Sequence, residues 1–296
     1  MKFLIIGASG YIGEYCYHFL KSNGYPVVGT RFNSINSELI PFDLSKDMVS
    51  TVVNSSFFTG NEKIFAVIFA AFSQVERCFR EKEESYKVNV EGTIRILKDL
   101  TNYGITPIYI STSSVYDGLT GNYDENSSRN PQTEYGRQKL TVEKFIEQNI
   151  PQALILRLDK IVGDKPARRN PFFEWHKLIE RKQPILCLDN IISPTFIEDI
   201  VQSIIICCEK GFRGSLNLAS SEIFRREELV RQFSSALQKR SIIKLISEKE
   251  LNFLELRPPK TFLNSNKFIK ATGFNFTPMH EVFARFKNNL KDEQYG

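Results

Sequence analysis

FLIIGASGYIG, at residues 3–13, joins a short apolar run to three glycines that recur at every third position. The run from Phe3 to Ile6 is typical of a buried strand, and helical spacing follows at Tyr17, Phe19 and Leu20. In such a unit the first glycine permits a tight turn, the second lets backbone approach a pyrophosphate, and the third lets the helix pack on the strand. The helix N-terminus also offers free N–H groups to phosphates. We therefore expect a dinucleotide to contact Gly7, Ser9, Gly10, Tyr11, Ile12 and Gly13.

Apolar runs alternate with helical patterns through the first half of the chain. Strands are expected at residues 25–30, 64–70, 107–111 and 153–156, and helices at 85–103 and 134–149. Near-continuous apolar strands separated by helices indicate an α/β fold, a Rossmann-like doubly wound parallel sheet with helices on both faces. Ligands in such folds bind beyond the carboxyl ends of the strands, where the glycine loop and residues 111–118 lie.

The second half of the chain is less regular. Helices are expected at 197–209, 225–239 and 279–290, with short strands near 185–188 and 215–218. We predict a dinucleotide-binding domain at residues 1–164, with sheet elements returning near 191–220. Residues 165–190 and 221–296 are expected to form a smaller α/β lobe that binds substrate.

Tyr135 and Lys139 lie four residues apart on an expected helix, so they share one face a single turn apart. A tyrosine normally holds its proton until about pH 10, and a nearby ammonium favours the phenolate. The pair therefore suits proton transfer to or from a substrate oxygen. Together with the dinucleotide-binding segment, the pair is a stronger functional signal than either motif alone.

Composition and charge exclude several classes of protein. The chain has 296 residues, 42% hydrophobic and 25% charged, which is typical of a globular protein with a large core. The net charge of +5 is modest and its basic residues are spread out, so nucleic-acid binding is not expected. The first residues already belong to the glycine segment, so no signal peptide is expected, and no apolar run reaches the ~20 residues of a membrane span.

The cysteines and histidines show no metal-ligand spacing. Five cysteines, at positions 16, 78, 187, 207 and 208, include no C-x-x-C pair, and only three histidines are present. We expect no metal site, no disulfide framework and reduced thiols in a cytoplasmic protein.

Further motifs follow the glycine segment in order along the chain. They are Phe69-Ala70-Ala71, Val88-Asn89, Ser111-Thr112-Ser113-Ser114-Val115-Tyr116-Asp117-Gly118, Tyr135-x-x-x-Lys139, Arg157, Ser193-Pro194-Thr195 with Asp199, and Arg257-Pro258-Pro259. Together they resemble the extended short-chain dehydrogenase/reductase family, and within it the dTDP-4-dehydrorhamnose reductase-like branch of nucleotide-sugar enzymes. The resemblance extends over nearly the whole chain.

The resemblance implies that Tyr135 donates a proton to a carbonyl oxygen as hydride arrives from the nicotinamide. It implies that Lys139 lowers the Tyr135 pKa and binds the nicotinamide ribose, and that Thr112 steadies the substrate oxygen. Ala70 and Ala71 are implied to contact the cofactor. Ser113 and Ser114 lie next to Thr112 in the sequence and remain alternatives for this role. Serines and threonines at strand ends also cap backbone groups routinely, which is the structural alternative for all three hydroxyls.

Cofactor choice follows from the end of the second expected strand. NAD-specific sites place an acid there to hold the ribose hydroxyls, whereas an arginine accommodates a 2′-phosphate. This chain has Arg31 there and no acid until Glu38, so NADP(H) is favoured over NAD(H). By resemblance Asp43 and Leu44 contact the adenine, although Asp43 might equally cap a helix.

The chain departs from the branch at two positions that the resemblance places against the sugar. Ser113 stands where the rhamnose reductases have an aspartate, and Lys160 where they have a tryptophan. Lys160 either contacts an anionic or carboxamide substituent or pairs with Asp159. Arg168 and Arg257 complete the expected substrate-binding residues.

These patterns predict an NADP(H)-dependent reductase of a nucleotide-linked 4-keto sugar. Two alternatives share the motifs: a nucleotide-sugar epimerase with bound NAD(P), and a non-catalytic NADP-binding regulatory subunit. A homodimer is the default for a soluble homo-oligomer.

Overall fold

The computed structural model describes residues 1–52, 57, 60–247, 250 and 253–294. Positions 248–249, 251–252 and 295–296 of the expected lobe lie outside these described residues.

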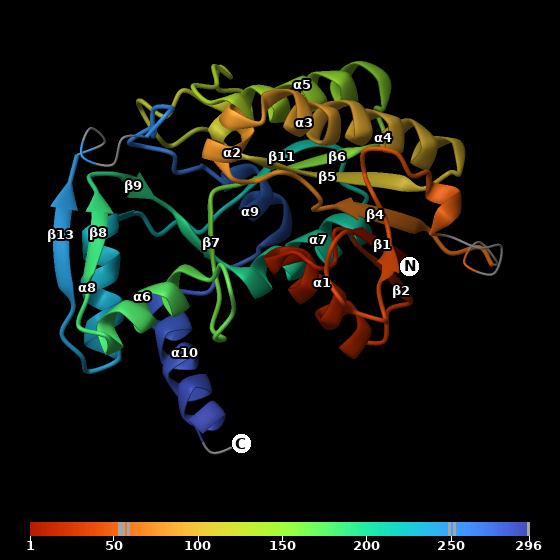
Figure 1. Ribbon diagram of the computed structural model, residues 1–296. Coiled ribbons are helices and arrows are strands. Elements are labelled where there is room, and N and C mark those ends of the chain that lie inside the picture. The colour runs from red at the N-terminus through yellow and green to blue at the C-terminus, as the bar shows by residue number, and fades with distance from the viewer. Residues whose placement is uncertain (53–56, 58–59, 248–249, 251–252, 295–296) are drawn as a thin grey trace.

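A seven-stranded sheet forms the centre of the molecule (Figure 1), in the order β11-β6-β5-β4-β1-β2-β3, and every neighbouring pair is parallel. Its strands are β1 (Lys2–Ile6), β2 (Val27–Arg31), β3 (Ile40–Pro41), β4 (Ile64–Ile68), β5 (Thr106–Thr112), β6 (Leu154–Leu158) and β11 (Gly214–Leu218). The apolar runs produce this sheet because strands covered on both faces need no polar alternation. The predicted doubly wound α/β fold is confirmed.

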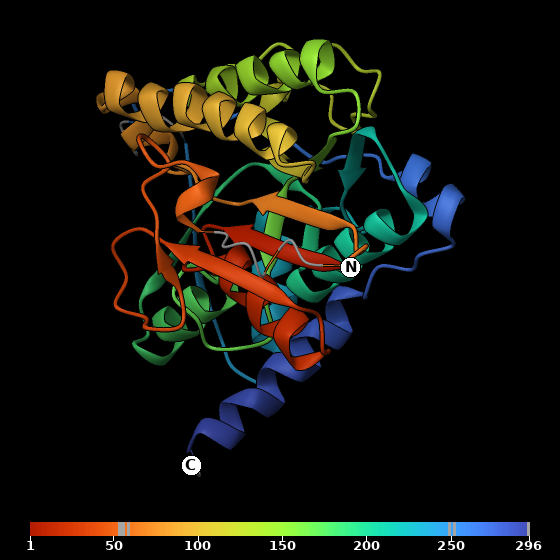
Figure 2. The ribbon, with the colours of Figure 1, turned by 90° about the vertical axis from the view of Figure 1, so that its right-hand side faces the viewer.

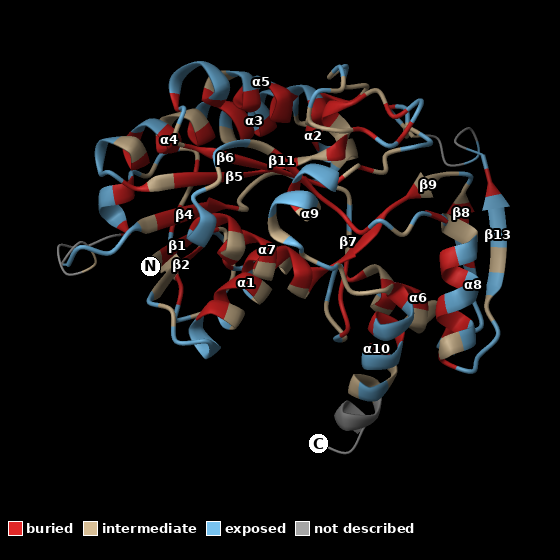
Figure 3. Cartoon of the chain, turned by 180° about the vertical axis from the view of Figure 1, so that it is seen from behind, coloured by how far each residue is buried: buried red, intermediate tan, exposed pale blue. Residues whose placement is uncertain are grey.

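Helices cover both faces of the sheet. α1 (Tyr11–Ser22) and α7 (Ile197–Lys210) pack on one face with α9 (Asn266–Thr272), while α4 (Thr93–Asn102) and α5 (Glu134–Asn149) pack on the other. The two helical layers and the sheet between them are seen edge-on in Figure 2. Figure 3 shows the strands buried between helices whose outer surfaces are exposed.

The helix expected at residues 85–103 is present and contains a π-helical segment. The structure has α2 (Val75–Arg80), followed by a continuous helical stretch of α3 (Lys82–Tyr86), η3 (Lys87–Gly92) and α4. Segments of π-helix inside α-helices often occur at functional sites. Asn89 is buried within η3, and its contacts are described below.

A smaller lobe packs beside the carboxyl ends of β5 and β6. It contains α6 (Pro171–Glu180), β8 (Pro184–Leu188), β9 (Ile191–Ile192), β12 (Phe224–Arg225), α8 (Arg226–Ala236), β13 (Ile242–Ile246) and α10 (Met279–Gln294). Its core is aromatic, with Phe172 stacked on Phe233 at 4.8 Å between ring centroids. Two short strands, β7 (Lys160–Val162) and β10 (Pro194–Phe196), pair in parallel where the chain passes between lobe and sheet.

The lobe and the sheet share packing residues. Ile12, Tyr15 and Ile161 each contact both the core under the sheet and the core of the lobe. The lobe is therefore fixed against the glycine loop and the ends of the strands.

Among the described residues, no helix combines the length and the hydropathy that crossing a membrane requires. The same residues contain no group of three or more potential metal ligands.

Candidate active site

The glycine loop connects β1 to α1 and closes against the segment after β4. Gly7 has a φ of 95°, and a methyl group there would lie 2.6 Å from the Ala70 nitrogen, so only glycine fits this turn. A methyl group at Gly13 would lie 2.3 Å from the Gly7 carbonyl oxygen, so glycine also lets α1 start close to β1. Gly10 is the extended N-cap of α1. Backbone alone therefore surrounds the N-terminus of α1, as a bound pyrophosphate requires.

The remaining loop residues differ in where their side chains lie. Ser9 is exposed, whereas Ile12 packs between the sheet core and the lobe core. The Tyr11 hydroxyl is buried beside Gly163 and has no hydrogen-bond partner in the described part of the chain. Tyr11 and Ile12 can therefore offer a phosphate only their backbone N–H groups, while Ser9 can also offer its hydroxyl.

Ala70 and Ala71 are held in place by the π-turn residue Asn89. The Asn89 Oδ1 accepts a hydrogen bond from the Phe72 N–H at 2.8 Å, and its Nδ2 donates to the Phe72 carbonyl at 3.1 Å. The same Nδ2 donates to Oε1 of Gln138 on α5 at 2.8 Å. Asn89 thus fixes the segment after β4 between the glycine loop and the helix that carries Tyr135.

Arg31 ends β2 with its guanidinium held by the following loop. Its Nε donates to the Leu39 carbonyl at 3.2 Å and its Nη1 to the Ser34 carbonyl at 2.7 Å. Nη2 makes no hydrogen bond within the described residues. Glu38, the first acid after β2, pairs instead with Lys21 at 2.9 Å. The end of β2 therefore presents an oriented cation and no carboxylate.

Asp43 and Leu44, the expected adenine contacts, form a turn after β3. The Asp43 Oδ1 accepts from the Ser45 N–H at 2.9 Å and from Ser45 Oγ at 2.7 Å, and Lys46 lies 3.3 Å from its Oδ2. Arg95 of α4 donates to the Leu44 carbonyl at 2.8 Å. The carboxylate of Asp43 therefore orders its own turn in the absence of a nucleotide.

Tyr135 lies in the first turn of α5, which packs on the turn after β5. Thr133 caps the helix by accepting from the Gly136 N–H at 3.1 Å. A methyl group at Gly136 would lie 2.2 Å from the Ser114 carbonyl oxygen, so the helix and this turn are in direct contact. The first turn of α5, which carries Tyr135, therefore lies against the turn that follows Thr112, the last residue of β5.

Lys139 is buried under Tyr135. Its Nζ donates to the Ile110 carbonyl at 2.8 Å and lies 4.6 Å from the ring centre of Tyr109 and 5.8 Å from that of Tyr135. Burial lowers the pKa of Lys139 to about 8, against an opposing effect of the Glu143 carboxylate. Its ammonium therefore titrates near neutral pH.

The pKa of Tyr135 is raised above 10, because surrounding protein desolvates the phenolate and a thiolate at Cys78 would repel it. Desolvation is the largest cause of this shift, and the Lys139 ammonium, which binds the Ile110 carbonyl, lies 5.8 Å from the centre of the Tyr135 ring. The expected lowering of the Tyr135 pKa by Lys139 stays a prediction. Because its pKa is raised, Tyr135 keeps its proton at neutral pH, as a proton donor must.

The three hydroxyls after β5 have different partners. The Thr112 Oγ1 accepts from the Ser114 N–H at 3.2 Å and donates to Ser114 Oγ at 3.2 Å. Ser113 Oγ donates to Asp159 Oδ1 at 2.8 Å. Ser113 therefore binds the carboxylate after β6, and Thr112 and Ser114 share a local turn beside Tyr135.

A buried ion pair joins α5 to the sheet one turn after Lys139. The Glu143 carboxylate accepts from Arg157 of β6 at 2.9 Å and 2.8 Å, and from Ser111 Oγ of β5 at 2.5 Å. Glu143 was not predicted as a site residue. Its spacing of four from Lys139 was the available signal, because this spacing puts both on one helix face.

Three basic side chains lie near one another at the junction of β7 with the lobe. Lys160 is affected electrostatically by both Arg226 and Arg257. Arg257 Nη2 donates to Glu76 Oε1 at 2.9 Å, and its guanidinium lies 4.6 Å from the Phe253 ring centre. Arg226, at the start of α8, was not predicted, because nothing in the local sequence distinguishes it from Arg225.

Arg168 is not joined to this group. It is exposed in the connection after β7, which Asn170 orders by accepting from the Gly163 N–H at 3.2 Å and donating to the Lys165 carbonyl at 2.8 Å. No hydrogen bond or ion pair in the described residues links Arg168 to the other candidate site residues.

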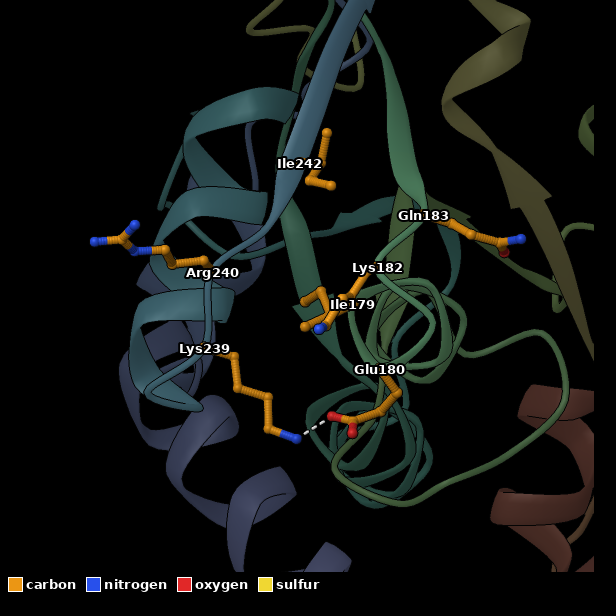
Figure 4. Close-up of a pocket in the computed structure, with 7 residues that line it drawn as sticks. All are labelled: Ile179, Glu180, Lys182, Gln183, Lys239, Arg240 and Ile242. Carbon is orange, nitrogen blue, oxygen red and sulfur yellow. Dashed lines mark hydrogen bonds and ion pairs between the residues drawn. The ribbon is translucent and has the colours of Figure 1, made fainter.

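A surface hollow between α6, α8 and β13 is separate from this site (Figure 4). It is lined by Ile179, Glu180, Lys182, Gln183, Lys239, Arg240 and Ile242, and Lys239 forms an ion pair with Glu180. None of these residues belongs to the sheet or to α5. The hollow therefore contributes nothing to the candidate active site.

Comparison with known proteins finds relatives that match nearly the whole chain. The family model described as the RmlD substrate binding domain matches residues 1–291. A dTDP-4-dehydrorhamnose reductase of Aggregatibacter actinomycetemcomitans is 26% identical over 288 residues, covering 92% of this chain and 93% of the relative.

Two solved structures have the same fold. A hypothetical dTDP-4-dehydrorhamnose reductase from Sulfolobus tokodaii has a TM-score of 0.82 and 25% identity, covering 95% of this chain and 99% of its own. A dTDP-4-dehydrorhamnose reductase from Bacillus anthracis, in complex with NADP, has a TM-score of 0.82 and 21% identity, covering 97% and 99%.

Proposed function

Because this chain belongs to the RmlD substrate binding domain family and is an NAD(P)-dependent oxidoreductase of the short-chain dehydrogenase/reductase type, we propose that it reduces a nucleotide-linked 4-keto sugar. The observation that carries the proposal is the contact of the first turn of α5 with the turn after β5. In support of the proposal, the turn of α5 that carries Tyr135 lies against the turn after Thr112, and Lys139 bonds the Ile110 carbonyl of the same strand.

The residues divide the chemistry among themselves. NADPH, when bound, supplies a hydride to the keto carbon. Tyr135 donates its proton to the keto oxygen, so that the carbonyl becomes an alcohol, and its raised pKa keeps that proton available. Thr112 holds the same oxygen through its hydroxyl. Lys139 binds the ribose next to the nicotinamide and stabilises the tyrosinate left after proton transfer.

We favour NADP(H) over NAD(H) on the geometry at the end of β2. Arg31 is oriented by two backbone carbonyls, which leaves Nη2 for a 2′-phosphate. Ribose hydroxyls would need an acid there, and Glu38 is already paired with Lys21. The glycine loop, Ala70, Ala71, Asp43 and Leu44 complete the cofactor site in this proposal.

For the substrate we assign the diphosphate to the arginines of the lobe. Arg226 and Arg257 lie close enough to Lys160 to affect its ionisation. Nε of Arg226 is buried and has no partner among the described residues, so an anion would satisfy it. Arg168, exposed on the neighbouring connection, is assigned the outer edge of the nucleotide.

Five buried, unpaired cysteines are compatible with the cytoplasmic location that we propose for the enzyme.

The test is NADPH consumption against a panel of nucleotide-linked 4-keto sugars, with Tyr135→Phe alongside. We expect turnover on at least one sugar, its loss in the variant, and an NADPH affinity within a few-fold of wild type, because only the proton donor is removed. Undiminished turnover in Tyr135→Phe would contradict the assignment of the donor. Tight NADPH binding without any consumption would favour a regulatory subunit, and interconversion of sugars without net consumption would favour an epimerase.

A further inference from the structure

Lys160 is the first residue of β7, and no hydrogen bond or ion pair joins its ammonium to any described residue. Its side chain is exposed, and its pKa is lowered because the protein around it desolvates the ammonium.

The adjacent carboxylate of Asp159 favours the charged form of Lys160 but makes no direct hydrogen bond or ion pair with it among the described residues. Asp159 Oδ1 accepts from Ser113 Oγ at 2.8 Å, and its Oδ2 accepts from the Ser193 N–H at 3.1 Å and from Ser193 Oγ at 3.4 Å. Both oxygens are therefore committed to the turn after β5 and to β10. Pairing with Asp159, the alternative raised by the sequence, does not occur.

The nearest other charges have the same sign. Arg226 and Arg257 both disfavour the protonated form of Lys160. Arg257 has Glu76 as a partner, whereas Nε of Arg226 is buried without one in the described part of the chain. Cations grouped in this way are stabilised when an anion binds among them.

Lys160 lies at the reacting end of this group. Asp159, its neighbour in sequence, is hydrogen-bonded to Ser113, and Ser113 follows Thr112 directly. Under the proposed reductase function, a sugar whose keto oxygen is held by Thr112 and Tyr135 would have its ring on the side of the site where Lys160 lies. The diphosphate, at the other end of the sugar, is left to the two arginines.

We propose, on the premise of the reductase function above, that the sugar carries a carboxylate on the ring carbon next to the keto carbon and that Lys160 binds this carboxylate. A lysine and a carboxylate form a charge-assisted hydrogen bond, which is among the stronger polar contacts. A neutral hydroxymethyl or methyl group at that carbon would leave the ammonium of Lys160 without a counter-charge. The substrate class is therefore a nucleotide-linked keto-uronic acid, and the reaction product is a nucleotide-linked uronic acid.

The test measures binding independently of turnover. The NADP⁺-loaded chain is titrated calorimetrically with UDP-glucuronic acid and UDP-glucose, and with the same pair of dTDP sugars. In whichever series the chain binds, UDP or dTDP, we expect wild type to bind the nucleotide-linked uronic acid about tenfold more tightly than the neutral sugar. Lys160→Met should abolish this preference by weakening the acid alone, with the neutral sugar unchanged within about twofold. Lys165→Met, which removes an exposed lysine from the following connection, is the control and should keep the preference.

Three results would overturn the proposal: no preference for the acid in wild type, no measurable binding of the acid in either series, or equal weakening of both sugars in Lys160→Met. The last result would place Lys160 on the diphosphate. Failure of the reductase function is distinguishable, because absent NADPH consumption with an intact acid preference would remove the reaction and leave the carboxylate site standing.

Discussion

Protonation of two residues sets the chemistry that this site can perform. Tyr135 has a raised pKa and retains its proton, while Lys139 has a pKa lowered to about 8 by burial. Tyr135 is therefore protonated at neutral pH. Lys139, the cation that we propose to stabilise the tyrosinate, is the group that titrates at about pH 8. In the reduction that we propose, both residues are protonated.

The pH dependence of reduction follows from Lys139. Because its pKa is lowered to about 8, the ammonium is present below that pH, and kcat/KM should fall as pH rises through it. Glu143 opposes the lowering, so Glu143→Gln should move this alkaline limb to lower pH. The measurement is the pH profile of kcat/KM from about pH 6 to 10.

Glu147→Gln is the matched control for this profile. Glu147 lies one further turn along α5, pairs with Arg129 at 2.7 Å, and is not among the groups that affect the Lys139 pKa. The alkaline limb of the kcat/KM profile of Glu147→Gln should coincide with that of wild type. A limb that does not move in Glu143→Gln would mean that Lys139 does not govern the alkaline loss of activity.

Arg31 should discriminate between the two nicotinamide cofactors. Arg31→Ala removes a charged donor from the proposed 2′-phosphate site, so the dissociation constant for NADPH should rise about ten- to hundredfold, while that for NADH changes little. Fluorescence titration with each cofactor measures both constants. Equal losses for NADPH and NADH would mean that Arg31 supports the fold of the loop rather than reading the phosphate.

At the scale of elements, the position of α5 depends on the buried pair Glu143–Arg157. Both side chains are buried, and they join the catalytic helix to β5 and β6. Arg157→Leu would leave the Glu143 carboxylate buried with only the Ser111 hydroxyl and the partly exposed Arg129 as partners. We expect a loss of about 3–5 kcal/mol in the free energy of unfolding, measured by urea denaturation.

Arg129→Leu separates this effect from the general loss of a basic residue. Arg129 bonds Glu143 from the partly exposed side, so its removal should cost clearly less than removal of Arg157. Similar losses in the two variants would contradict the view that burial of the charge dominates. Near-wild-type stability of Arg157→Leu would show that the pair does not hold α5 in place.

Elements defined by local pattern were predictable, and those defined by distant contacts were not. The glycine loop, β1, β4, β5 and α5 follow from apolar period and glycine spacing within about a dozen residues. Strands β7 and β10 have three residues each and pair across 34 residues, and β13 pairs with β8 across 58, so these strands depend on distant contacts. The π-helical segment that contains Asn89 lies within a continuous helical pattern, and Asn89 accepts a hydrogen bond there from the N–H of Phe72, 17 residues away.

The candidate site divides in the same way. Tyr135, Lys139 and the glycines were predictable because their spacing has a chemical meaning within one helix or loop. Arg226 and Glu255 were not, because their roles depend on partners in other elements. Glu255 accepts from the Glu134 N–H at 2.6 Å, capping α5 from 121 residues away.

Over the whole molecule, lobe and sheet are joined at both ends of the site. Ile12, Tyr15 and Ile161 pack against both cores near the glycine loop. On the other side Glu255 caps α5, and Arg257 pairs with Glu76 of α2. Loosening either core would therefore disturb contacts of the other, which favours unfolding as a single unit.

The single tryptophan makes this coupling measurable. Trp175 is buried in the lobe core and reports that core alone, whereas far-UV circular dichroism reports all helices and strands. We expect the two signals to give coincident urea transitions. NADPH, proposed to bind the sheet domain, should stabilise by about 2.7 kcal/mol at a hundredfold excess over its dissociation constant, and should shift the Trp175 transition by the same amount as the dichroism transition. An earlier Trp175 transition that NADPH leaves in place would mean that the lobe unfolds independently. Contacts between the two parts, such as the Arg257–Glu76 pair, would then open without global unfolding.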